Sequence, residues 1–139
     1  MISAQVVVAN YGMIHQFHRV CGGQFRQSLD RGVDALGGGR TILVAPPTLW
    51  GLRNPGQTWG LGAAFLPLCE SWAREHANAT VLDPAPATLA RRDATEDGMH
   101  YGHGPDDAAL PDGAARDVGS VGLALVAKLY RLIGAPPPG

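Results

Sequence analysis

Residues 41 to 45, Thr-Ile-Leu-Val-Ala, decide the fold that this sequence predicts. An unbroken run of apolar and β-branched residues is typical of a strand buried on both faces, as in the centre of a parallel sheet. Pro46-Pro47 ends the run, because proline cannot donate a hydrogen bond to a ladder. Residues 4 to 9, Ala-Gln-Val-Val-Val-Ala, predict an earlier strand of the same kind, and residues 79 to 82 predict a third, weaker one that ends at Asp83-Pro84.

Amphipathic helices are predicted between and after these strands. Apolar residues recur at three- and four-residue intervals from Cys21 to Leu36, where Gly37-Gly38-Gly39 ends the helix. A second helical stripe runs from Leu61 to Trp72, and Pro67 predicts that this helix kinks or begins there. A loop rich in Pro, Ala, Arg and Asp follows the third strand, and a last helix is expected to bury Val118, Val121, Leu125, Leu129 and Leu132.

The alternation of strands and helices predicts the fold class. It indicates one α/β domain over residues 1–139, a three-layer sandwich of flavodoxin-like type with a short parallel sheet. The sequence opens almost directly into a strand, so we expect a domain that is incomplete at its N-terminus.

Charge and cysteine content narrow the classes of partner. Eleven basic and twelve acidic residues give a net charge of -1, and Arg91-Arg92 is the longest basic run, so nucleic acid is not an expected partner. The sequence has no transmembrane or signal segment, no cofactor motif, and no feature that fixes its compartment or oligomeric state. Cys21 and Cys69 lie in apolar helical stripes, which predicts buried free thiols.

The candidate site is expected at the carboxyl ends of the strands, where ligands collect in open α/β sheets. Three segments should meet there: Asn10-Tyr11-Gly12, the loop that starts at Pro46, and the loop that contains Asp97 and His100. An aspartate and a histidine three residues apart on a turn can form the base and its orienting carboxylate in a serine-hydrolase triad. The Asn10 amide, with a backbone N–H near Gly12, could then stabilise an oxyanion.

These residues resemble the SGNH/GDSL hydrolase superfamily, and within it the PC-esterase branch that includes the plant trichome-birefringence-like polysaccharide O-acetyltransferases. Residues 6 to 15, Val-Val-Val-Ala-Asn-Tyr-Gly-Met-Ile-His, look like that family's strand and Asn-containing block. Residues 97 to 101, Asp-Gly-Met-His-Tyr, look like its terminal Asp-x-x-His block, and Val81-Leu82-Asp83 and Arg92-Asp93 look like the region ahead of it.

The resemblance implies an SGNH-like fold and acyl transfer through a serine ester, with a carbohydrate ester as substrate. By the same resemblance Asn10 is an oxyanion donor, His100 the general base and Asp97 its orienter. Gly12 and His15 are assigned to substrate binding. The loop residues Trp50 and Trp59 are assigned to it as well, since an aromatic face stacks well on sugar C–H groups.

The sequence departs from the family at the nucleophile. The similarity covers only the later part of a family domain, and the early Gly-Asp-Ser block and the block with an oxyanion glycine are both absent. None of the serines, Ser3, Ser28, Ser71 and Ser120, follows Gly-Asp. We therefore expect a C-terminal portion of such a domain, inactive by itself.

Two other classes of function stay open from the sequence. A non-catalytic α/β module that binds a sugar or a protein partner would explain the missing nucleophile. A metal site is the other alternative, with ligands drawn from Asp97, His100, His103, Asp106 and Asp107, although this loop has no established metal-ligand spacing.

Overall fold

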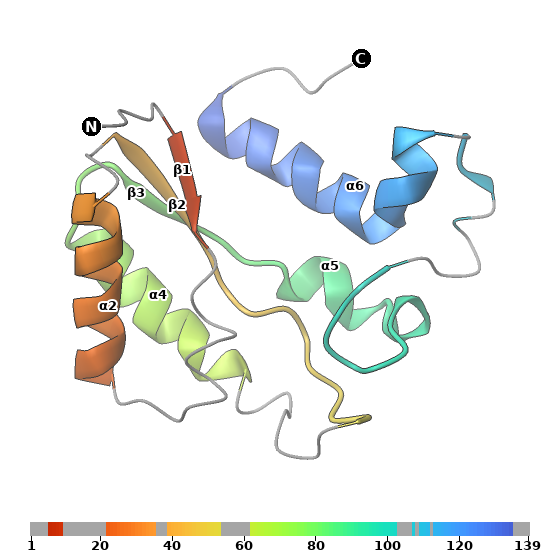
Figure 1. The fold of residues 1–139 in the computed structure, drawn as a ribbon, viewed down its shortest axis with the longest axis horizontal. Coiled ribbons are helices and arrows are strands. Elements are labelled where there is room, and N and C mark those ends of the chain that lie inside the picture. The colour runs from red at the N-terminus through yellow and green to blue at the C-terminus, as the bar shows by residue number, and fades with distance from the viewer. Residues whose placement is uncertain are drawn as a thin grey trace. The chain divides into compact units, whose positions relative to one another are not determined.

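The computed structural model describes residues 6–9, 22–35, 39–53, 62–102, 107, 109–111 and 113–134, with the backbone alone at 6–9, 22–23 and 114–118. This part of the chain contains three strands, four α-helices and one 3₁₀ helix (Figure 1). It divides into two compact units, residues 1–46 with 60–83 and residues 47–59 with 84–139.

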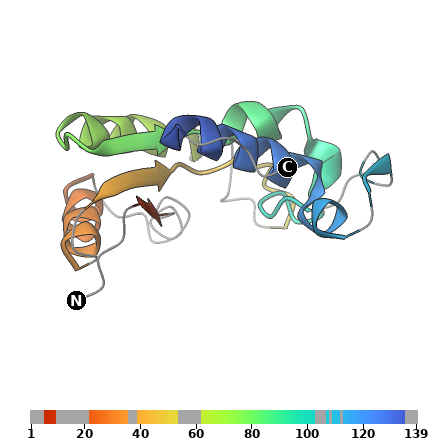
Figure 2. The same cartoon turned by 90° about the horizontal axis from the view of Figure 1, so that it is seen from above.

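The first unit contains a three-stranded parallel sheet. Strands β1 (Val6–Ala9), β2 (Arg40–Val44) and β3 (Ala79–Leu82) lie in the order β1-β2-β3 (Figure 2). Ala9 pairs with Leu43 and Val44 pairs with Leu82, so the chain leaves all three strands at one edge of the sheet. Thr41, Ile42 and Leu43 are all buried, which agrees with a central strand.

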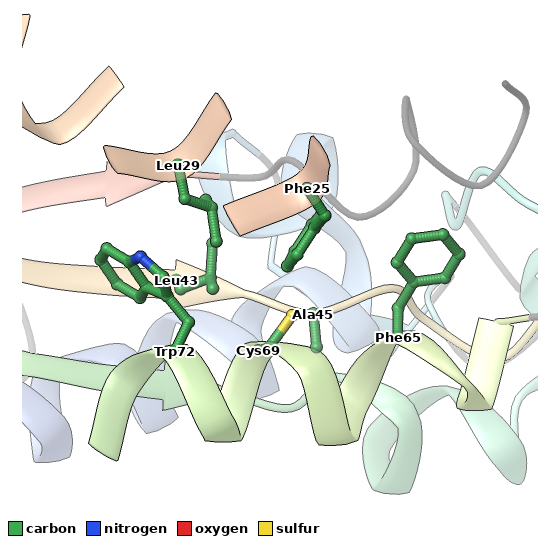
Figure 3. Close-up of a cluster of buried hydrophobic side chains, with 7 residues drawn as sticks. All are labelled: Phe25, Leu29, Leu43, Ala45, Phe65, Cys69 and Trp72. Carbon is green, nitrogen blue, oxygen red and sulfur yellow. The ribbon is translucent and has the colours of Figure 1, made fainter. Parts of the chain in front are cut away.

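Helices α2 (Gly22–Ala35) and α4 (Phe65–Arg74) connect these strands and pack on one face of the sheet. Phe25 and Leu29 of α2 and Phe65, Cys69 and Trp72 of α4 meet Leu43 and Ala45, which point to the same side because they are two residues apart (Figure 3). The rings of Phe25 and Phe65 pack edge to face with centroids 5.8 Å apart.

The strand order explains why both helices share a face. Crossovers between parallel strands are nearly always right-handed, so two crossovers that progress in the same direction across a sheet place both helices on the same side. The mixed α/β class and the parallel sheet are therefore confirmed for this unit, in which α2 and α4 cover one face of the sheet.

Two details of α4 bear on the predictions. The helix begins at Phe65, so Pro67 lies in its first turn, where backbone N–H groups have no acceptor within the helix. Trp72, predicted to lie in the core, is 1% exposed. Burial raises the pKa of the Cys69 thiol to about 12, as expected for an inert free cysteine, while Cys21 lies outside the described residues.

The second unit contains α5 (Ala85–Leu89), the 3₁₀ helix η1 (Arg92–Ala94) and α6 (Ala114–Ile133). The sequence predicted only a loop where α5 and η1 occur, and that prediction was wrong. Thr88 in α5 is buried and accepts a hydrogen bond from the Thr48 backbone N–H at 2.9 Å, which fastens the segment after Pro47 to this helix.

The last helix is present but is interrupted at Gly119. Gly119 has φ 77° and ψ 164°, which are not helical values. The buried carboxylate of Asp107 accepts a hydrogen bond from the Ser120 N–H at 2.9 Å and so caps the segment that follows the kink. Val121 is buried, while Leu125, Leu129 and Leu132 are half-buried.

The packing of β2 generates the first testable prediction. Leu43→Ala should lower the free energy of unfolding by about 2–5 kcal/mol, because it leaves a cavity at a site that is 0% exposed. Leu89→Ala, at a side chain that is 50% exposed, should change it by about 0.5 kcal/mol or less. Urea unfolding measures both, and equal losses would contradict the position of the core.

Candidate functional site

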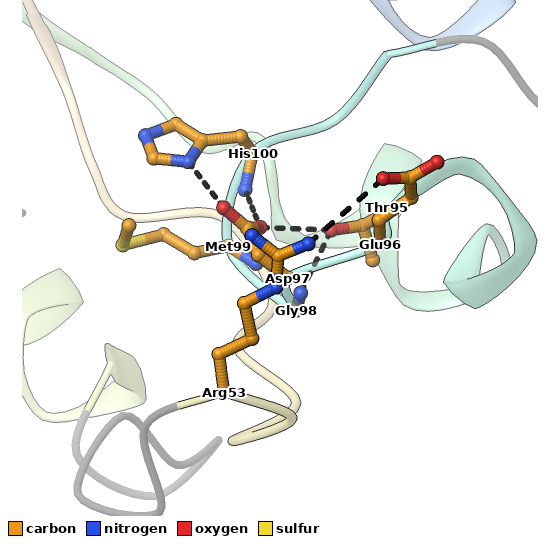
Figure 4. A network of polar contacts seen from close by, with 7 residues as sticks. All are labelled: Arg53, Thr95, Glu96, Asp97, Gly98, Met99 and His100. Carbon is orange, nitrogen blue, oxygen red and sulfur yellow. Dashed lines mark hydrogen bonds and ion pairs between the residues drawn. The ribbon is translucent and has the colours of Figure 1, made fainter.

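Asp97 organises a tight turn over residues 95–100 in the second unit. Its Oδ1 accepts hydrogen bonds from the backbone N–H groups of Met99 and His100, both at 2.8 Å, and from the Thr95 hydroxyl at 3.3 Å (Figure 4). The Gly98 N–H donates to the Thr95 hydroxyl at 3.0 Å. Asp and Thr favour such turns because their side chains bond the local backbone. Gly favours them because, without a Cβ, it adopts positive φ readily.

The other oxygen of this carboxylate holds the His100 ring. Asp97 Oδ2 lies 2.6 Å from His100 Nδ1, so the neutral imidazole donates through Nδ1 and keeps its lone pair on Nε2. The His100 side chain is 77% exposed, whereas that of Asp97 is only 22% exposed. Within the described part of the chain, Nε2 has no hydrogen-bond partner.

The hydrogen bonds keep Asp97 ionised. The backbone N–H of His100 is the largest cause that lowers the pKa of Asp97 far below its ordinary value, and partial burial opposes it. The His100 ring and the Met99 N–H lower the pKa further. The pair therefore has a charged carboxylate on one side of the imidazole and an accessible basic nitrogen on the other.

A second histidine and aspartate pair, in the first unit, has a different geometry. His76 Nε2 lies 3.2 Å from Asp30, and His76 Nδ1 lies 2.7 Å from the Trp72 carbonyl oxygen. The ring also stacks on the Trp72 indole with centroids 4.1 Å apart. Both nitrogens of His76 are occupied, so this pair joins α2 to α4 and has no free nitrogen for proton transfer.

The turn is anchored to residues 48–52. The Trp50 N–H donates to the Gly98 carbonyl at 2.9 Å. The Tyr101 hydroxyl accepts from Trp50 Nε1 at 2.8 Å and donates to the Thr48 carbonyl at 2.6 Å. Burial raises the pKa of Tyr101, so this hydroxyl stays protonated and can donate.

A cavity of about 380 Å³ lies beside the pair. Both basic and acidic groups contribute to its wall, and Arg53 Nη2 lies 4.0 Å from Glu96 Oε2 (Figure 4). The residues that line it are Arg53, Ala94, Glu96, Asp97, His100, Tyr101 and Gly102. A ligand in this cavity would therefore meet the His100 ring together with a donor and an acceptor side chain.

Only part of the predicted site falls within the described residues. Asp97 and His100 are brought together, while Asn10, Gly12, His15 and Trp59 lie outside the described residues. Trp50 is described: its indole N–H is bonded to Tyr101, and the Arg92 guanidinium carbon lies 6.0 Å from its ring centroid. Trp50 does not line the cavity, and its part in sugar binding stays a prediction.

Sequence reasoning assigned no role to Thr95, Arg53, Glu96 or Tyr101. The spacing of Thr95, Asp97 and Gly98 is a local turn signal that could have indicated the first of these. Glu96 and Tyr101 are sequence neighbours of Asp97 and His100, whereas Arg53 is brought to the cavity by contacts between distant residues, which no local pattern records.

The metal site that the sequence left as an alternative has no cluster of ligands in the described part of the chain. No group of three or more His, Cys, Asp or Glu side chains able to hold a metal ion occurs among the described residues. His103 and Asp106, two of the predicted ligands, lie outside them.

Comparisons with known protein families, with curated proteins and with solved structures give no significant match to this chain. In the described residues, no helix is long and apolar enough to cross a membrane.

Gly98 provides a test of the turn. It has φ +82°, and a Cβ there would lie 3.1 Å from the Leu52 backbone nitrogen. Gly98→Ala should therefore lower the free energy of unfolding by about 1–3 kcal/mol. Gly102→Ala is the matched control, because a Cβ at Gly102 meets nothing within 4 Å. Equal losses in urea unfolding would exclude a tightly packed turn at Gly98.

The ionised Asp97 predicts a pH dependence of stability. Asp97→Ala should cost about 1–2 kcal/mol at neutral pH, because it removes the acceptor of the turn. Since folding lowers the pKa of Asp97, its stabilisation is complete above the ordinary aspartate pKa of about 4 and is lost as the pH falls below it.

The difference in unfolding free energy between wild type and Asp97→Ala should therefore narrow between about pH 5 and pH 3. Asp34→Ala, which removes an exposed aspartate of α2, is the control for the loss of one carboxylate. A gap for Asp97→Ala that is unchanged at low pH would show that the carboxylate is not held ionised by the turn.

Proposed function

We propose that this chain contributes the base half of an SGNH/GDSL-like acyl esterase or O-acetyltransferase site that acts on a carbohydrate ester. The observation that carries the proposal is the Asp97 and His100 pair, in which Nδ1 meets the carboxylate at 2.6 Å and Nε2 has no partner among the described residues. The sequence resemblance of residues 6–15 and 97–101 to the PC-esterase branch supports the same assignment.

In the proposed reaction His100 moves one proton. A serine oxygen bonds to the acyl carbon while its proton passes to Nε2, and the ester C–O bond then breaks as the leaving alcohol takes that proton. Water or an acceptor hydroxyl attacks the acyl-serine by the same route and regenerates the serine. Asp97 orients the ring and stabilises the imidazolium that forms between these steps.

Further parts of the proposal concern the fold, the cavity and the oxyanion donor. The order β1-β2-β3 is compatible with a three-layer SGNH-like sandwich. Arg53 and Glu96 give the cavity one donor and one acceptor side chain, which suits the hydroxyl groups of a carbohydrate. Asn10 follows the last residue of β1 and is proposed as the oxyanion donor.

The proposed nucleophile is the serine of a Gly-Asp-Ser block, which residues 1–139 do not contain. Ser71 and Ser120 accept hydrogen bonds from Arg26 and Arg91, and neither follows Gly-Asp. The proposal requires a Gly-Asp-Ser block in addition to residues 1–139. A protein without such a block would instead favour the alternative, a non-catalytic α/β module that binds a sugar or a partner.

Acetyl-ester hydrolysis tests the role of His100. In a chain that includes the Gly-Asp-Ser block, His100→Ala should lower kcat/KM for an acetylated oligosaccharide by about a hundredfold or more, because it removes the general base. His76→Ala is the matched control and should leave the rate nearly unchanged, since both nitrogens of His76 bind within the fold. Activity that survives His100→Ala would refute the assignment.

A further inference from the structure

The stretch 98–101 is fastened at both ends while the His100 ring between them is exposed. At one end the Gly98 carbonyl accepts from the Trp50 N–H, and at the other the Tyr101 hydroxyl lies between Trp50 Nε1 and the Thr48 carbonyl. No other hydrogen bond holds the His100 side chain in the described residues besides that from Nδ1 to Asp97. The orientation of the ring therefore depends on this one bond and on the position of the His100 backbone.

The geometry points to Tyr101 as a positioning residue, whose hydroxyl fixes the backbone beside His100 so that Nδ1 faces Asp97 and Nε2 stays free. This inference rests on the proposed function, because it assigns the orientation that a general base needs. Tyr101 itself lines the cavity, so the anchor lies directly at the site. Its two partners, Thr48 and Trp50, are far away in sequence, which makes the position of His100 depend on the tertiary fold.

The same contacts give Trp50 a role in addition to the sugar stacking that the sequence predicted. Its indole N–H is bonded to the Tyr101 hydroxyl and its backbone N–H to the Gly98 carbonyl, so it supports the turn through two groups. The position of Thr48 is in turn fixed by buried hydrogen bonds to Thr88 and by a partly buried one to the Ala85 carbonyl. A hydroxyl placed between a fixed donor and a fixed acceptor has little freedom to move.

The imidazole tautomer gives a direct readout of this positioning. When Asp97 accepts from Nδ1, neutral His100 carries its proton on Nδ1, whereas a free histidine side chain favours Nε2. Long-range ¹H–¹⁵N NMR spectra distinguish the two forms of the neutral ring. His100→Gln assigns the resonances, because it removes one set of ring signals.

In the wild-type chain we expect the Nδ1–H form of His100. Tyr101→Phe should lower the ratio of Nδ1–H to Nε2–H by roughly five- to tenfold, the effect of losing about one net hydrogen bond. Trp50→Phe, which removes one of the two bonds to the hydroxyl, should lower the ratio less. Tyr130→Phe, which removes a hydroxyl from a half-buried residue of α6, is the matched control and should leave the ratio unchanged.

The outcomes separate this inference from the proposed function. A Tyr101→Phe chain that unfolds at lower temperature but keeps the wild-type tautomer would overturn the inference, because the hydroxyl would then only stabilise the fold. If Tyr101→Phe does not fold, an unchanged tautomer in Trp50→Phe overturns it equally. A wild-type Nε2–H form would refute the inference and the pair together, whereas loss of ester hydrolysis in His100→Ala tests the proposed function alone.

Discussion

The carboxylate of Asp97 is the group on which the candidate site depends. One of its oxygens accepts from two backbone N–H groups and a hydroxyl, and the other accepts from the His100 ring. Without this acceptor the N–H groups of the turn would lose their partner, and an imidazole that is 77% exposed would lose the hydrogen bond to its ring. The shape of the turn and the tautomer of the histidine thus have the same physical cause.

The sequence predicted the regular elements whose signals are local. Apolar periodicity in α2 and α4, and the unbroken apolar run in β2, identify these elements because each depends on its own residues. It missed α5, a short helix fastened by Thr48 from a distant segment, and the interruption of α6 at Gly119. Asp107 caps the helix after that kink from thirteen residues away, a contact that has no periodic signature.

The same distinction explains which parts of the site could be predicted. Asp97 and His100 are three residues apart, so the turn chemistry that joins them is visible in the sequence. The bonds from Tyr101 to Trp50 and Thr48 span 51 and 53 positions, and they exist only because the fold brings the two segments together. Asn10, the third predicted catalytic residue, lies outside the described residues, so its role still depends on the sequence resemblance.

The two histidine and aspartate pairs show that proximity to a carboxylate does not define a base. Asp30 accepts from the Trp72 indole at 2.9 Å as well as contacting His76, so its charge is used to hold two helices together. His76 has a carbonyl at one nitrogen and a carboxylate at the other, so neither nitrogen is open to a substrate. At the wall of a cavity, His100 has one bonded nitrogen and one nitrogen without a partner in the described part of the chain, and this asymmetry makes it the better candidate for proton transfer.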